Sequence, residues 1–217
     1  MKKLFTLLFA IASATAYAEP TVVAPSVKTP TSFAVFIDRA SYDRCREAVE
    51  AYRAAVQADG LGTYIICDDW QSPDEVRERI LALASDKRMP LEGVVFVGDV
   101  PIAMLRDAQH LSSAFKMNQA ADRKKSSIPS DRFYDDFDLK FDFIDRAADN
   151  PLYFYYSLRH DSAHHIRSDI YSARIKPVVR EGVDKYEALS AYLRKAAAEH
   201  GAANRLDHMF VFCGHGY

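Results

Sequence analysis

The sequence contains few cysteines, and their number argues against a disulfide framework. Only three occur in 217 residues, Cys45, Cys67 and Cys213, and an odd, small number does not cross-link a fold. Cys67 and Cys213 each end an apolar, strand-like run, and Cys45 lies in a helical pattern, so all three are predicted to be buried free thiols. No cluster of His and Cys has the spacing of a zinc site.

Long apolar runs and an excess of one charge are also missing. Beyond the N-terminal stretch, no segment is apolar enough to span a membrane. The formal net charge of -2 is mildly acidic and gives no reason to expect nucleic-acid binding. There is no internal repeat and no low-complexity segment. The length and the ordinary globular composition predict one domain with a sizeable core.

The N-terminus has the layout of a secretory signal peptide. Two lysines precede the short apolar run Leu4–Ala14, and a small-x-small cleavage site follows at 16–18. The run is too short for a permanent anchor. A buried N-terminal helix is the alternative. We therefore predict export to the periplasm, the cell surface or the medium, with a signal peptide at 1–18, a leader at 19–32 and a folded domain at 33–217.

Apolar and β-branched runs alternate with helical patterns along the rest of the chain. Strands are expected at 33–37, 63–67, 93–97, 169–175 and 208–213. Helices are expected after the N-caps Ser41 and Ser72 and over 184–199. A short helix is expected around Met104 and a loop over 110–127. This alternation predicts an α/β fold with a mostly parallel sheet, flanked by helices through right-handed crossovers.

Residues 128–168 have a different composition, in which aromatic residues alternate with aspartates. Two interpretations are open. The segment is an antiparallel ribbon with cross-strand aromatic pairs and solvated acids, which we favour. Alternatively, its carboxylates bind calcium as a structural ion.

Three features lie where strands of such a sheet end, which is where catalytic groups gather in open α/β sheets. They are Gly98-Asp99, the acidic stretch around Asp131, and Gly214-His215-Gly216. Histidine suits general-base work near neutral pH, and the two flanking glycines free the backbone to present it. The alternative is a tight turn with an incidental histidine.

These features, in this order, resemble the gingipain-type (C25-like) cysteine peptidases of the wider caspase-like clan. The similar segments are the strand 93–99 ending in Gly-Asp, the Pro-Ser-Asp segment 128–136, the strand 168–177, the helix 184–195 and the Gly-His-Gly turn 214–216. The resemblance runs from about Gly93 to Tyr217. It implies a caspase-like (Rossmann-like) fold, incomplete at the C-terminal side, and a cysteine endopeptidase that acts on protein or peptide substrates without a cofactor.

The resemblance also implies roles for two residues. His215 would be the general base for a nucleophilic cysteine, and the backbone N–H of Gly216 would help to hold the oxyanion. The sequence departs from the family in two ways. Ala173 stands where the family strand has glycine before arginine, and the family's nucleophile lies on a later strand, whereas this chain ends at Tyr217.

Cys213 is a poor substitute for that nucleophile. Residues two apart on a strand stand roughly 6–7 Å apart, whereas a Cys-His pair needs hydrogen-bond reach of roughly 3 Å. We therefore expect the 217-residue chain to be inactive by itself. The alternative functions are an inactive exported caspase-like domain that acts as a binding module, and an unrelated α/β domain with an incidental Gly-His-Gly.

Overall fold

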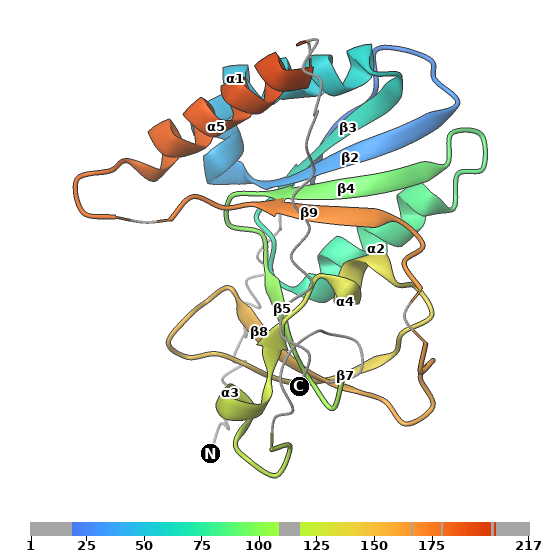
Figure 1. Ribbon diagram of the computed structural model, residues 1–217, viewed down its shortest axis with the longest axis vertical. Helices are drawn as coiled ribbons and strands as arrows, with labels where there is room; N and C mark the ends of the chain where they lie inside the picture. The colour runs from blue at the N-terminus through green and yellow to red at the C-terminus, as the bar shows by residue number, and fades with distance from the viewer. Residues whose placement is uncertain (1–18, 109–117, 166, 179, 201, 203–217) are drawn as a thin grey trace, which may run out of the picture.

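A mostly parallel sheet forms the centre of the computed structural model, which describes residues 19–108, 118–165, 167–178, 180–200 and 202. Within these residues the strand order of this main sheet is β1-β3-β2-β4-β9. Figure 1 shows α1 and α5 over one face and α2 and α4 on the other. The prediction of an α/β fold with a mostly parallel sheet flanked by helices is confirmed.

Four strands of the main sheet lie close to their predicted positions, whereas β1 lies in the predicted leader. The strands are β1 Thr21–Val23, β2 Thr31–Asp38, β3 Leu61–Asp68, β4 Leu91–Val97 and β9 Tyr171–Ile175. β2 pairs in parallel with β3 and β4, β4 pairs in parallel with β9, and β1 is antiparallel to β3. The chain moves outward from β2 to β3 and then crosses back to β4. The carboxyl ends of β2 and β4 therefore form a switch point, the usual location of a site in open α/β sheets.

The three long helices are α1 Arg39–Ala58, α2 Pro73–Ala84 and α5 Lys185–His200. Ser72 caps α2 as predicted, because its hydroxyl accepts a hydrogen bond from the backbone N–H of Glu75. The predicted cap Ser41 is wrong. Asp38 caps α1 and accepts from the N–H of Ser41 at 2.9 Å, since the helix begins directly after β2 without a loop.

Both faces of the main sheet are covered, which explains the continuous apolar runs of its strands. Successive side chains of a strand point to opposite faces. Val35 and Ile37 of β2 pack toward α1 and α5, whereas Ala34 and Phe36 pack toward α2. The core on the α2 side continues without a break into the rest of the molecule, where Phe133, Tyr134, Phe154 and Tyr156 join it.

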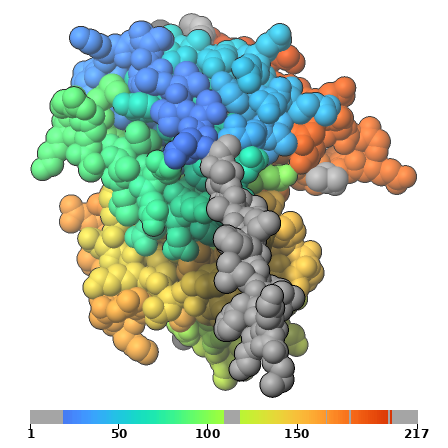
Figure 2. All heavy atoms as spheres, turned by 180° about the vertical axis from the view of Figure 1, so that it is seen from behind, coloured from blue at the N-terminus to red at the C-terminus, as the bar shows by residue number. Residues whose placement is uncertain are grey.

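The second sheet has the order β6-β5-β8-β7. Its strands are β5 Ile102–Arg106, β6 Ile128–Pro129, β7 Phe141–Arg146 and β8 Tyr153–Leu158, accompanied by the short helices α3 Arg123–Ser126 and α4 Arg132–Asp135. We call this sheet with α3 and α4 the arm. Figure 2 shows the arm, mostly yellow, below the main sheet and its helices. β7 and β8 are antiparallel, so the predicted ribbon is confirmed.

The short helix predicted around Met104 is wrong. These residues form β5, which pairs in parallel with β8 and in antiparallel fashion with β6. The partner strand β8 lies about fifty residues further along the chain, and this non-local pairing decides the conformation of a short apolar run. Part of the predicted loop over 110–127 is the helix α3, and residues 109–117 lie outside the described part.

Helix α2 attaches the arm to the main sheet. The guanidinium of Arg77 donates to the backbone carbonyls of Asp136, Phe137 and Leu139 at 3.2, 3.4 and 2.8 Å. It also lies 5.4 Å from the centre of the Phe133 ring. Burial lowers the pKa of Arg77 from its ordinary value. The side chain therefore replaces solvent for three carbonyls that the loop leaves unpaired.

The predicted leader contributes to the sheet, because Thr21–Val23 form β1 and Thr31 begins β2. The predicted signal peptide at 1–18 lies outside the described residues. Among the described residues, no helix has both the length and the apolar character needed to cross a membrane.

Candidate active-site edge

Arg174 of β9 joins two of the segments that the sequence placed at strand ends, the loop after Asp99 and the acidic stretch at Asp131. Its guanidinium donates to the carboxylate of Asp131 at 2.8 Å and to the carbonyls of Val100 and Pro101 at 2.8 and 3.1 Å. It also lies 4.8 Å from the centre of the Phe96 ring of β4. One largely buried side chain thus connects β9, the loop after β4 and the arm.

The Pro-Ser-Asp segment packs directly beneath β4. Tyr134 is fully buried, donates its hydroxyl to the carbonyl of Pro101 at 2.8 Å, and has its ring 4.6 Å from that of Phe96. Burial raises the pKa of Tyr134 above its ordinary range. Asp131 precedes α4 but makes no capping hydrogen bond, since its carboxylate is bonded to Arg174. The segment therefore supports the sheet edge and is not a free loop.

Asp99 lies at the switch point between β2 and β4. The carboxylate of Asp38 accepts from the backbone N–H of Asp99 at 2.7 Å. The Asp99 carboxylate itself pairs with Lys185 at 2.8 Å and with Lys176. Burial works against ionisation, but the hydrogen bonds from the two lysines hold the pKa of Asp99 below its ordinary value. Asp99 is therefore a charged link between β4, the end of β9 and α5.

A cavity of about 490 Å³ adjoins this edge, between the carboxyl end of β9 and α5. Its lining includes the cations Arg174, Lys176 and Arg180 and the apolar side chains Val178, Val183 and Tyr192. Val178 and Tyr192 are 69% and 54% exposed. Among the described residues β9 is the edge strand of the main sheet. Apolar side chains are thus exposed beside the edge of β9 with which no described strand pairs.

The two described cysteines do not supply a nucleophile. Cys45 and Cys67 are buried free thiols, as predicted. Burial raises the pKa of Cys67 to about 11, so almost none of it is thiolate at neutral pH. The Cys45 thiol lies in the core between α1 and α5, 3.4 Å from the carbonyl oxygen of Tyr186. Cys213 lies outside the described residues.

The acidic segment is partly internal, which the sequence did not reveal. Asp135 accepts from the hydroxyl of Ser172 at 2.6 Å and from Arg132 at 3.1 Å, and burial raises its pKa. Asp136 is fully buried and accepts from the backbone N–H of Arg167. In the sequence, the aromatic residues beside these acids were the available sign that the acids are buried. No group of three or more potential metal ligands occurs among the described residues, and calcium binding stays a prediction.

The predicted catalytic residues, His215 and Gly216, lie outside the described residues, as does the strand predicted at 208–213. The structure pairs Asp131 with Arg174 and sets Arg174 against the carbonyl of Val100, the residue after Asp99, and the role of His215 stays a prediction. Searches against protein-family models, curated proteins and solved structures gave no match. The function of this edge is therefore inferred from the contacts of its own residues.

Proposed function

We propose that this chain belongs to an exported cysteine endopeptidase of the gingipain type in which His215 is the general base. The observation that supports the proposal is the convergence of three separate segments of the resemblance, at 98–99, 129–134 and 174–177. Arg174 contacts both of the others or their immediate neighbours.

The order of the elements supports a place for His215 at this edge. α5 follows β9 and packs beside α1 on one face of the main sheet (Figure 1). Among the described residues, the edge of β9 that faces away from β4 has no strand partner. We propose that the strand expected at 208–213 occupies this position in parallel with β9. Its carboxyl end then delivers the turn 214–216 to the edge that holds Asp99 and Arg174.

In the proposed mechanism His215 takes the proton of a cysteine thiol contributed from beyond Tyr217. The thiolate attacks the scissile carbonyl carbon, and the backbone N–H of Gly216 stabilises the oxyanion that forms. The protonated imidazole gives its proton to the leaving amine. Water then attacks the acyl-enzyme with His215 again as base and releases the acid product. The substrates are proteins or peptides.

The buried described cysteines favour a second candidate for the 217-residue chain itself. With Cys45 and Cys67 in the core, neither is available to a substrate. A catalytically inactive exported domain that binds other molecules is consistent with this arrangement. The two candidates differ in whether a reactive cysteine accompanies His215 in the complete protein.

The test begins with the coding DNA past the Tyr217 codon, read in all three frames for an apolar strand ending in cysteine. The corresponding protein is then treated with a peptidyl acyloxymethyl ketone, which labels only activated thiols. His215→Ala is expected to abolish labelling, whereas His160→Ala, an exposed position on the arm, is expected to leave it intact. Equal labelling of His215→Ala and wild type, or a stop with no cysteine in any frame, overturns the peptidase proposal.

A further inference from the structure

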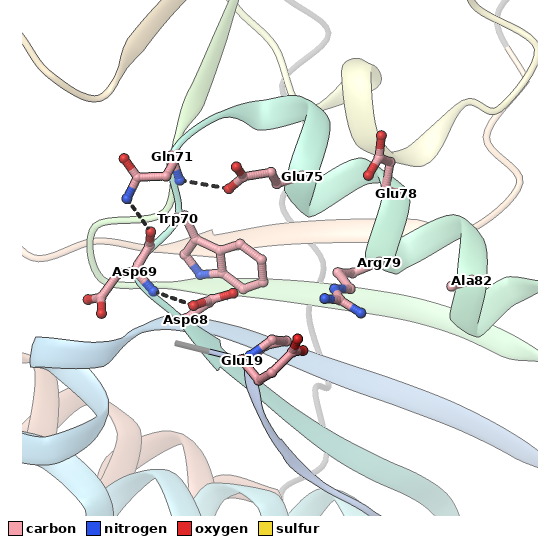
Figure 3. A pocket seen from close by; sticks show the side chains of 10 residues that line it. Glu19, Asp68, Asp69, Trp70, Gln71, Glu75, Glu78, Arg79 and Ala82 are labelled. Atoms are coloured by element: carbon pink, nitrogen blue, oxygen red, sulfur yellow. Dashed lines mark hydrogen bonds between the residues drawn. The ribbon is translucent and has the colours of Figure 1, made fainter. Parts of the chain in front are cut away.

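A second cavity lies at the opposite edge of the main sheet, at the carboxyl end of β3. Its volume is about 440 Å³, and Figure 3 shows Glu19 on one side of it and helix α2, with Glu75, Glu78 and Arg79, on the other. Asp68 and Asp69 at the end of β3 also line it. The cavity shares no residue with the candidate active-site edge.

The register of β1 fixes the position of Glu19 beside this cavity. β1 is antiparallel to β3 with Thr21 opposite Cys67. Continuing the ladder by two residues sets the backbone of Glu19 opposite Asp69. Arg39 holds this corner, because it donates to Asp69 at 2.9 Å and to the hydroxyl of Thr21 at 3.4 Å. Glu19 itself lines the cavity, so the segment that leads into β1 lies beside this acidic wall.

The charges around the cavity are unbalanced. The carboxylates of Glu19, Asp68, Asp69, Glu75 and Glu78 line it, and the cations beside them are Arg79 of the lining and Arg39, which pairs with the two aspartates. Five carboxylates and two guanidinium groups leave an excess of three negative charges. Like charges around one cavity repel, and a further cation relieves that repulsion.

We propose that this cavity receives the α-ammonium group of Glu19 that signal-peptide cleavage creates. Hydrolysis of the Ala18–Glu19 bond adds the hydroxyl of water to the Ala18 carbonyl and one hydrogen to the Glu19 nitrogen. That nitrogen takes a further proton from solvent, since an α-amino group is mostly protonated at pH 7. A neutral amide thus becomes a cation at the one backbone position that the register sets opposite Asp69.

The inference depends on the predicted cleavage after Ala18 and is independent of the proposed peptidase activity. It links export to folding. Before cleavage the acidic wall faces a neutral peptide bond, and after cleavage it holds β1 against β3 through an additional ion pair. Removal of the signal peptide therefore stabilises the edge of the main sheet as well as releasing the protein.

The test compares residues 19–217 with a free N-terminus and the same chain acetylated at the α-amine. The free chain is released from a fusion by a protease that leaves Glu19 first, and acetylation at mildly acidic pH spares the lysines. We expect acetylation to lower the melting temperature by about 2–4 °C, and the difference to shrink in about 1 M salt. The α-amino group is expected to titrate above its ordinary range of about 7.7–8.0.

Two variants separate this contact from a general charge effect. Asp69→Asn is expected to reduce the effect of acetylation, whereas Glu47→Gln, an exposed acid on α1, is expected to leave it unchanged. If Asp69→Asn does not fold, the comparison of the free and acetylated chains alone tests the proposal. Equal melting temperatures of the free and acetylated chains, with an α-amino group that titrates in its ordinary range, overturn the proposal.

Discussion

The main sheet and the arm are held together in different ways. In the main sheet, the strands carry apolar side chains on both faces and pack under the helices that follow them in the chain. The same kind of strand–helix contact therefore recurs along the sheet. In the arm, aromatic side chains and single polar contacts from distant segments supply the order, as with Arg77 and the carbonyls of 136–139. The comparison teaches that the arm should fail at single residues, whereas the main sheet should tolerate most surface changes.

The largest effect is expected at Arg174, where the two regions meet. Arg174→Met removes the pairing with Asp131 and leaves the carbonyls of Val100 and Pro101 without their donor. Breaking a largely buried ion pair from one side costs about 3–4 kcal/mol of unfolding free energy. Urea denaturation measures this loss of unfolding free energy. Arg180→Met is the control, because Arg180 lines the same cavity beside β9 as Arg174 but is exposed. Similar costs for the two variants would show that Arg174 does not join the regions.

Gly98, which follows β4, should be sensitive to an added side chain. Its φ is +76°, and an added Cβ would lie 2.3 Å from both the Asp38 carboxylate and the Ser41 hydroxyl. Gly98→Ala is therefore expected to cost about 2–3 kcal/mol. Gly60 has φ +96° but open space around it, so Gly60→Ala is expected to cost only about 1 kcal/mol. Thermal unfolding of both variants measures the difference, and equal losses would contradict the packing at the switch point.

Arg77→Met should loosen the arm selectively. It removes three hydrogen bonds to 136–139 and the contact with Phe133, at an expected cost of about 2 kcal/mol. Hydrogen exchange is expected to rise in residues 132–141 and to stay unchanged in β2 and β3. Arg79→Met, an exposed change on the same helix, should leave exchange in the arm as in wild type. A uniform rise over the whole chain would argue against a separate attachment of the arm.

The smallest effect concerns pH. Because the pKa of Asp99 is lower in the folded state than in the unfolded state, its contribution to stability is present above the unfolded pKa and is lost as pH falls through the folded pKa. The pKa of Lys185 is raised, chiefly by its hydrogen bond to Asp99, so its contribution is lost only as pH rises through that raised value. Unfolding free energies of wild type and Asp99→Asn should therefore differ at neutral pH and converge in acid. If the two unfolding free energies differed by a constant amount down to about pH 2, the ion pair of Asp99 would not contribute to stability.

The regular part of the fold could be predicted from the sequence, for physical reasons. The runs at 33–37, 63–67 and 93–97 are apolar throughout because each strand is buried on both faces, and Ser72-Pro73 marks a helix start by local chemistry. β5 could not be predicted, because its partners lie far along the chain. Asp38 was missed as a cap because it also ends a strand.

The candidate site was predictable only in part. The sequence indicated Asp99 from its position after an apolar run and Asp131 from the acidic stretch around it, and it gave no sign that Arg174 would bond to Asp131. Ion pairs between residues forty positions apart depend on how the arm folds back under β4. The buried positions of Asp135 and Asp136 depend on the same packing, since local composition alone predicts that aspartates are exposed.

The measurement that tests the central claim most directly is hydrogen exchange at the free edge of β9. We propose that the strand expected at 208–213 pairs with β9 and so brings His215 to the edge of Asp99 and Arg174. We predict that the β9 amides that do not bond to β4 are protected in the chain of 217 residues and lose that protection on truncation after Ala202. Amides of β3 serve as the internal reference. Unchanged exchange in β9, with β3 also unchanged, would contradict the proposed position of His215.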